Sequence, residues 1–224
     1  MHNYSLSRSN RKTIAIYVRN GVVDVRAPLR MPKHLIDAFV KSKEKWIGEK
    51  LEKLNDLTLR RNSFTLSYGD PVAYRGKQYP IVAQQGNRIG FDEKSFYMPG
   101  DLTPEQIKYA CIQIYRMLAK RDLTTKALAY AQRMSVTPSA VKINSARSRW
   151  GSCSSKNSLN FSWMLIMADD ELIDYIVVHE LAHITELNHS ERFWSIVEGI
   201  LPDHRARRAK LKELQQRLNT EDWA

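Results

Sequence analysis

The sequence predicts an α+β fold, with a β-rich N-terminal region that includes one long helix and a C-terminal half built from helices and a β-hairpin. Two observations carry most of this prediction. In the N-terminal part, short runs of alternating apolar residues are separated by turn residues such as Asn20-Gly21, a pattern typical of β-hairpins. In the C-terminal part, apolar residues recur at helical spacing after residues 103 and 169.

The N-terminal region begins with a predicted hairpin at residues 11–28, in which Asn20-Gly21 forms the turn. Pro32 then opens a helix that we expect to run to about Leu54, because proline is favoured at the first helical position and apolar residues follow at helical spacing. Its residues indicate no particular chemistry. Short strands separated by turn residues are expected next, around residues 64–66, 72–74, 78–83, 88–91 and 95–98.

Pro99-Gly100-Asp101 is the predicted boundary between the two regions. A long helix to about Met134 is expected to follow, because Thr103 is a favourable N-cap and Pro104 occupies the first helical position. The predicted regions are residues 1–100 and residues 101–224.

Two strands are expected after this helix, near residues 141–144 and 159–166, with the turn-rich segment 154–158 between them. We interpret them as a β-hairpin that packs before the next helix. A short apolar helix around residues 193–200 and a basic last helix complete the expected C-terminal half.

The composition is that of a soluble globular protein. The 224 residues are 43% hydrophobic and 26% charged, and no apolar run reaches the length of a transmembrane helix. The first residues lack the apolar core of a signal peptide. Because Cys111 and Cys153 are far apart and form no C-x-x-C pair, a reducing, cytoplasmic location is the simplest interpretation. We expect no membrane association, and the oligomeric state is left open.

The chain carries a formal net charge of +11, and its basic residues concentrate at both ends. Such a field attracts nucleic acid, acidic partners or phosphorylated ligands. The competing interpretation is a solvated basic surface that keeps the protein soluble, because no stacking platform or groove-reading motif is evident. Nucleic acid bound through the basic ends is therefore kept as a candidate partner. These residues include Arg8, Arg11, Lys12, Arg19, Arg26, Arg30 and Lys33, and Arg205, Arg207, Arg208, Lys210, Lys212 and Arg217.

The strongest functional signal is an H-E-x-x-H motif that begins at His179 and ends at His183, followed by His189. Histidines four residues apart on a helix lie on the same face, so both imidazoles can bind one metal ion. Glu180 would lie near the same site and can act on a water molecule there. A third histidine just beyond the helix would complete three protein ligands and leave one position open, as in catalytic zinc sites.

The flanking sequence is that of a metal-binding helix. Asp169 or Asp170 is suited to the N-cap, and further acidic residues in the first turn interact favourably with the helix dipole. The helix is nearly apolar apart from the motif, so the polar groups of the motif need partners, and a metal ion would supply them. The competing interpretation is that these are solvent-facing or hydrogen-bonded helical histidines, although three of the chain's six histidines fall within eleven residues.

Three segments together resemble the YgjP-like, SprT-related family of metal-dependent hydrolases among the zincin metallopeptidases, and they share a third-ligand pattern with the WLM group. The resemblance is strongest over residues 145–200 and looser over the rest of the chain. The segments are Ser148–Cys153, His179–His183 and Asn188–Trp194. The zinc ligands and the general base that the resemblance implies are His179, His183, His189 and Glu180.

The histidine spacing also matches the metzincins, but the chain departs from them at Glu186, where they have glycine, and it shows no convincing Met-turn. The SprT-like resemblance implies a zincin-like catalytic half and a zinc-dependent metallopeptidase that acts on a protein or peptide substrate. One strand of the predicted hairpin would pair with the extended substrate by β-strand addition. Residues considered as donors to the developing oxyanion are Arg147, Arg149 and Tyr175. The competing interpretation for the two arginines is that they form salt bridges that anchor the hairpin.

Two other functions stay open on the sequence. One is a metal-dependent nucleoside triphosphate pyrophosphatase, a function also associated with the resembled family. It would favour Mg²⁺ or Mn²⁺ with oxygen ligands, whereas the sequence offers three histidines and no phosphate-binding glycine-rich loop. The other is a nucleic-acid-binding module with a structural metal, which usually needs four protein ligands, and Cys153 would be the fourth. The physiological metal is likewise left open.

Overall fold

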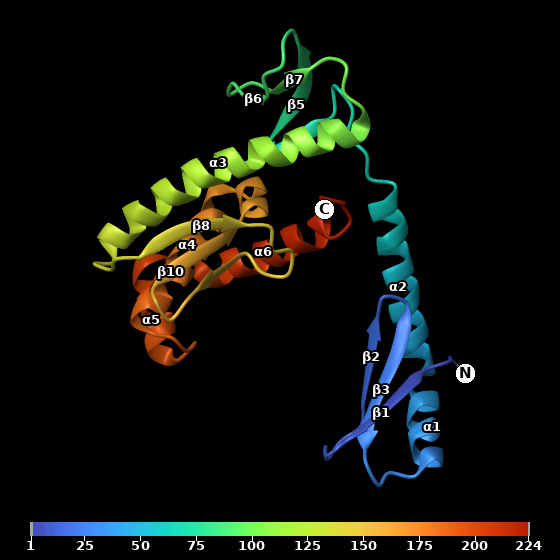
Figure 1. Cartoon of the computed structure of the whole chain (residues 1–224). Coiled ribbons are helices and arrows are strands. Elements are labelled where there is room, and N and C mark those ends of the chain that lie inside the picture. The colour runs from blue at the N-terminus through green and yellow to red at the C-terminus, as the bar shows by residue number, and fades with distance from the viewer. Residues whose placement is uncertain (1, 224) are drawn as a thin grey trace. The chain divides into compact units, whose positions relative to one another are not determined.

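The computed structural model describes residues 2–223, and it confirms the predicted α+β fold (Figure 1). These residues form two compact units. The first extends to Phe64 and includes Asn219–Asp222, and the second comprises Thr65–Leu218 with Trp223. The segment at residues 99–101, where the sequence predicts a boundary, lies inside the second unit between a strand and a long helix.

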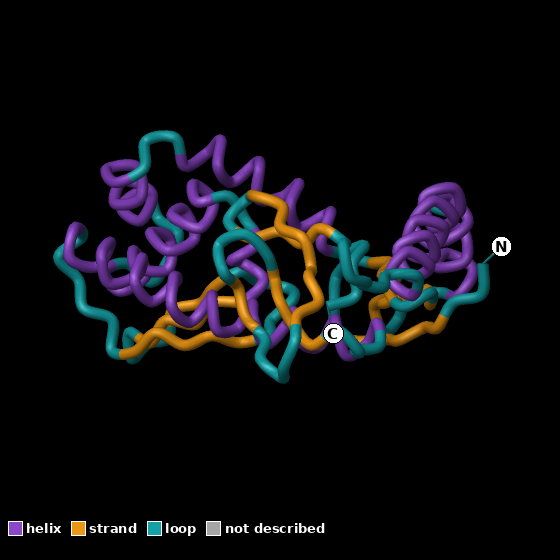
Figure 2. Tube along the Cα trace, turned by 90° about the horizontal axis from the view of Figure 1, so that it is seen from above, coloured by secondary structure: helices purple, strands orange, loops and turns teal. Residues whose placement is uncertain are grey.

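The first unit packs two helices on one face of a three-stranded sheet (Figures 1 and 2). Strand β3 (Val22–Pro28) is central, antiparallel to β2 (Ala15–Arg19) and parallel to β1 (Ser5–Ser9). The predicted hairpin is confirmed, and Asn20 and Gly21 have φ values of 49° and 74°, because a two-residue turn of this kind needs positive φ at both positions. The buried core of this unit consists of Val23, Val25, Ala27, Ile36, Val40 and Ile47.

The single long helix predicted for this unit is wrong in its continuity. The structure has α1 (Lys33–Ser42) and α2 (Glu44–Asn62), separated at Lys43, whose φ of −106° and ψ of 10° depart from helical values. The hydroxyl of Ser42 donates to the carbonyl of Phe39 at 2.7 Å, and such local bonds compete with a continuing helix. No proline or glycine marks the break, so the sequence pattern does not reveal it.

The second unit begins with a four-stranded sheet in the order β4-β5-β7-β6. Strands β4 (Pro71–Tyr74) and β5 (Lys77–Gln84) form an antiparallel hairpin, β7 (Phe96–Pro99) runs parallel to β5, and the short β6 (Gly90–Phe91) lies at the edge. These are four of the five strands that the sequence predicts here. Residues 64–66, predicted as the fifth, form no strand.

The long helix α3 (Pro104–Arg133) confirms the prediction, including its start. The Thr103 hydroxyl accepts the backbone N–H of Gln106 at 3.4 Å, and the Gln106 side chain accepts the backbone N–H of Thr103 at 2.8 Å. This reciprocal capping box satisfies two N–H groups that have no partner within the helix. On its buried side the ring of Tyr115 stacks on Trp163 with centroids 5.6 Å apart, so α3 supports the segment that precedes the motif helix.

The hairpin predicted in this half is wrong in its pairing. Strands β8 (Ala140–Asn144) and β10 (Ser158–Ser162) are parallel, and the antiparallel partner of β10 is β9 (Gly151–Cys153). The prediction assumed that strands separated by a turn-rich segment pair directly, whereas β10 inserts between the other two and leaves β9 at the edge. Strand β10 is also shorter than predicted, because the 3₁₀ helix η1 (Trp163–Met167) follows it.

Three helices complete the second unit, namely α4 (Asp170–Thr185), α5 (Glu191–Ile200) and α6 (His204–Leu218). Asp169 is the N-cap of α4, as predicted, and Ser190 caps α5 through its hydroxyl. Within residues 2–223, no helix is both long enough and apolar enough to cross a membrane.

The turn between β4 and β5 holds the start of α4. The backbone N–H of Arg75 donates to the carbonyl of Ile166 at 2.8 Å, and its guanidinium donates two hydrogen bonds to Asp170 at 2.8 and 2.6 Å. Gly76 has a φ of 76°, and a Cβ atom there would lie 1.7 Å from Oδ1 of Asp169. Glycine is therefore required both for the backbone conformation and for the close approach. We call Arg75 and Gly76 the Arg75 turn.

Candidate metal site

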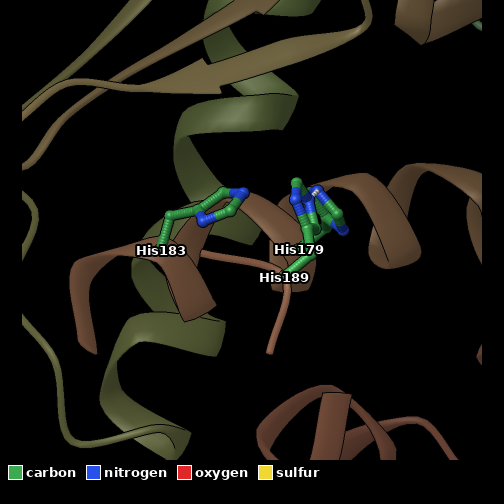
Figure 3. A group of neighbouring side chains, drawn as sticks. All are labelled: His179, His183 and His189. Carbon is green, nitrogen blue, oxygen red and sulfur yellow. Dashed lines mark hydrogen bonds between the residues drawn. The ribbon is translucent and has the colours of Figure 1, made fainter. Parts of the chain in front are cut away.

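Helix α4 carries the first two histidines of the motif on one face. His179 and His183 are four residues apart, and their ring centroids lie 5.0 Å apart, as the spacing on a helix leads one to expect. After α4 ends at Thr185, the chain turns and places His189 with its ring centroid 5.0 Å from that of His179 and 4.8 Å from that of His183. Figure 3 shows the three side chains converging.

The three histidines form a group that could hold a metal ion. One ring nitrogen of each lies within 4.8 Å of the others, and Nε2 of His179 is 3.1 Å from Nε2 of His189. Among residues 2–223 this is the one group of three or more histidine, cysteine or acidic side chains arranged so closely. Cys153, considered as a fourth ligand, does not belong to it.

The hydrogen bonding of the rings suits a metal ion between them. Nδ1 of His183 lies 3.1 Å from the carbonyl oxygen of Glu186. Because a carbonyl oxygen can only accept, Nδ1 carries the proton and Nε2 keeps its lone pair. Within the described residues, the buried Nδ1 of His179 has no hydrogen-bond partner, and its Nε2 faces His189. A buried imidazole whose nitrogens lack hydrogen-bond partners costs free energy. A metal ion that prefers nitrogen ligands would partly relieve that cost.

The surroundings keep two of these histidines neutral, which is the form that binds a metal. Burial lowers the pKa of His179 to about 3, and the proximity of His183, His189 and Arg208 is a smaller cause of the same shift. Burial also lowers the pKa of His189, again with smaller effects from His183 and Arg208. Both rings therefore present lone pairs near neutral pH.

Two aromatic residues of α5 form a wall of the site. The ring of Phe193 is buried, and its centroid lies 4.5 to 4.9 Å from the ring centroids of all three histidines. The ring of Trp194 lies 5.7 Å from His189 and 5.9 Å from His179. The structure thus places Trp194 against two of the candidate ligands.

Glu180 is buried beside the histidines, with 6% of its surface exposed. Burial raises its pKa to about 7, and the positive charge of Arg149 partly opposes this shift. The edge strand β9 leaves room for the carboxylate, since a Cβ atom at Gly151 would lie 2.6 Å from Cγ and 2.8 Å from Oε1 of Glu180. Nothing in the local sequence signals this contact, so sequence reasoning did not assign Gly151 to the site.

We expect Gly151→Ala to lower any activity of this site by about 100-fold, because a displacement of about 1 Å of a catalytic group has an effect of that order. The fold should tolerate the change. Gly151 does not need a positive φ, and the atoms in the way belong to a side chain that can move. The measurement is kcat/KM together with metal content and thermal stability. Gly199→Ala is the control, because a Cβ atom there meets nothing within 4 Å. Equal activity of both variants would contradict the proposed role of the contact between Gly151 and Glu180.

Two of the three residues considered as oxyanion donors lie near the candidate site. Tyr175 is buried with its ring 5.9 Å from that of His179, and Arg149 acts on Glu180. Both residues are therefore near the site. The choice of oxyanion donor between them stays a prediction. The group that orients His183 is the backbone carbonyl of Glu186.

Most of the chain is similar to a known protein family. Residues 12–214 match the family model described as YgjP-like, metallopeptidase domain. One similar solved structure is the metallopeptidase zymogen of Pyrococcus abyssi abylysin, with 19% identity over 45% of this chain and 98% of its own, at a TM-score of 0.39. Another is that of Methanocaldococcus jannaschii jannalysin, with 23% identity over 43% of this chain and 97% of its own, at a TM-score of 0.37. No curated protein matches.

Proposed function

The chain belongs to the YgjP-like metallopeptidase family, and we propose that it is a zinc-dependent peptidase whose ion is held by His179, His183 and His189. The observation that carries this proposal is the convergence of these three imidazoles next to the buried carboxylate of Glu180. Three imidazoles with an adjacent carboxylate are the ligands and general base typical of catalytic zinc sites. A structural zinc usually has four protein ligands, so three favour a site that is open to a reactant.

A zinc ion at this site would supply a Lewis acid that activates water and polarises the carbonyl of a peptide bond. Glu180 acts as the general base. Its carboxylate accepts a proton from the attacking water and then donates it to the leaving nitrogen. Because Gly151 has no side chain, this carboxylate can lie close to β9. Phe193 packs against His183, and Trp194 packs against His189.

The position of β9 supports an extended peptide as the substrate. This strand lies at the edge of its sheet, where one row of backbone groups faces away from β10. A peptide that adds to this edge gains backbone hydrogen bonds without requiring a particular sequence. Because Gly151 of β9 contacts Glu180, a peptide bound along this strand would lie next to the general base.

A nucleoside triphosphate pyrophosphatase is the less well supported alternative. Enzymes of that kind hold Mg²⁺ or Mn²⁺ mainly through oxygen ligands. The candidate group within residues 2–223 instead offers three nitrogen ligands. The family match, described as a metallopeptidase domain, also favours the peptide substrate.

This proposal is tested by identifying the products that the purified, zinc-loaded chain forms. We expect it to cleave unfolded protein substrates, with new amino termini detected by mass spectrometry, and to release no pyrophosphate from nucleoside triphosphates. Cleavage should stop when a chelator removes the ion and return when one equivalent of zinc is added. Metal-dependent release of pyrophosphate, with no cleavage of any peptide, would overturn the assignment.

A further inference from the structure

A cavity of about 560 Å³ lined by residues of α5 and α6 adjoins the candidate metal site. Trp194 forms the shared wall. Its ring lies 5.7 Å from that of His189 on one side, and it stacks on the buried ring of His204 with centroids 5.3 Å apart and an interplanar angle of 18°. A group bound in this cavity would therefore be one side chain away from the histidines.

Arg208 of α6 also lines this cavity. Its guanidinium carbon lies 5.8 Å from the centroid of the Trp194 ring. The same ring lies 5.7 Å from that of His189, so Arg208 is one side chain away from a candidate ligand. Arg208 thus places a permanent positive charge near the three imidazoles.

The neighbouring arginine differs from Arg208 in its partners. Arg207 forms an ion pair with Asp203 at 2.9 Å and donates to the carbonyl of Glu171 at 2.9 Å, so it is held in the fold. Among residues 2–223, Arg208 has no carboxylate within ion-pair distance, and its guanidinium lies over the ring of Trp194. A guanidinium held against a ring with its donors unused is available to a ligand.

We propose that Arg208 and Trp194 form a subsite that binds a carboxylate of the peptide substrate close to the cleaved bond. This inference rests on the proposed peptidase function and adds a substrate class to it, namely peptides that carry a carboxylate near the bond. The carboxylate can be the C-terminal group or an aspartate or glutamate side chain. Arginine suits this role, because its planar fork donates two parallel hydrogen bonds to a carboxylate.

The other lining residues favour a single negative charge. Glu191, Glu198 and Arg205 line the same cavity. The two carboxylates offset the charges of Arg205 and Arg208, and they repel a phosphate dianion or polyphosphate more strongly than one carboxylate. His204, which is 4% exposed, also lines the cavity, and within the described residues its buried Nδ1 has no hydrogen-bond partner. Of the two guanidinium groups, that of Arg208 lies against the ring of Trp194, so it is the one placed to receive a small, hydrogen-bonding carboxylate.

The test uses the zinc-loaded full chain and two pairs of peptides. One pair shares a sequence and differs in a free or amidated C-terminus. In the other pair both peptides are amidated and differ in glutamate or glutamine near the cleaved bond. The ratio of kcat/KM within each pair measures the preference and identifies which carboxylate is bound. In parallel, the same peptides are titrated calorimetrically into zinc-loaded Glu180→Gln chain, because this readout needs no turnover.

We expect the carboxylate peptide of at least one pair to be preferred by about 10- to 100-fold, the range for a hydrogen bond to a charged group. Arg208→Gln should abolish the preference, and Arg208→Lys should keep part of it. Lys212→Gln is the matched control, because it removes one exposed positive charge from the same helix without touching the cavity, and it should keep the whole preference.

Two results would overturn the subsite. One is equal cleavage and equal binding within both pairs by the parent chain, and the other is a preference that survives in Arg208→Gln. Both are distinct from a failure of the proposed function, in which the parent cleaves no peptide at all. In that case the calorimetric comparison still decides whether Arg208 selects a carboxylate.

Discussion

Glu180→Gln is expected to leave the metal ion bound and to lower peptide hydrolysis by roughly 10²- to 10⁴-fold, the usual contribution of a general base. The glutamine side chain has nearly the same shape, so it fits beside Gly151, where a larger change would clash. Its amide cannot take a proton from water, which removes the proposed step. Because the three histidines are untouched, elemental analysis should still find one ion per chain.

The measurement is kcat/KM on one peptide substrate, with metal content determined on the same sample. Glu171→Gln is a suitable control, because it makes the same chemical change in the first turn of the same helix, where the side chain is exposed and paired with Lys210. It should retain full activity. If Glu180→Gln hydrolyses the peptide as fast as the parent with its ion bound, Glu180 is not the base.

His183→Ala is expected to abolish both tight metal binding and activity. The remaining two ligands would hold the ion weakly, and the loss should exceed the roughly 10- to 100-fold change in affinity that follows removal of an outer partner of a ligand. His183 also packs against Phe193 at 4.5 Å, so alanine leaves a gap that lowers stability. His183→Gln keeps most of the volume and separates the loss of a ligand from the loss of packing.

Metal content by elemental mass spectrometry, with circular dichroism to verify folding, checks this expectation. His34→Ala provides the control, since that histidine is exposed in the first unit and its loss should change nothing at the site. A folded His183→Ala chain that retains one ion per chain would remove His183 from the ligands and would leave the metal-site proposal without its central residue.

The elements predicted correctly are those whose signals are local. The capping residues Thr103 and Gln106 mark the start of α3, and Asp169 with the acidic first turn marks α4. Strand β1 was missed because its residues are polar and mostly exposed, so it lacks the alternation that identifies a half-buried strand. It forms through pairing with β3, which is a contact between distant segments.

The same distinction applies to the site. His179, Glu180 and His183 are recognisable because helical spacing alone brings them together, and the approach of His189 follows from the end of the helix nearby. Gly151 and Arg208 come from a different strand and a different helix. Their relation to the motif depends on how β9 and α6 pack against α4, and no local pattern encodes that packing.

The Arg75 turn joins the β4–β5 hairpin to the start of the motif helix, and this limits the changes of length and sequence that the turn can accept. Hairpin turns usually accept changes of length and sequence. This turn should not, because an insertion would separate Arg75 from Asp170 and from the carbonyl of Ile166. A shortened chain that begins at residue 101 would contain the whole motif and still lose this anchor, whereas one that begins at Thr65 would keep it.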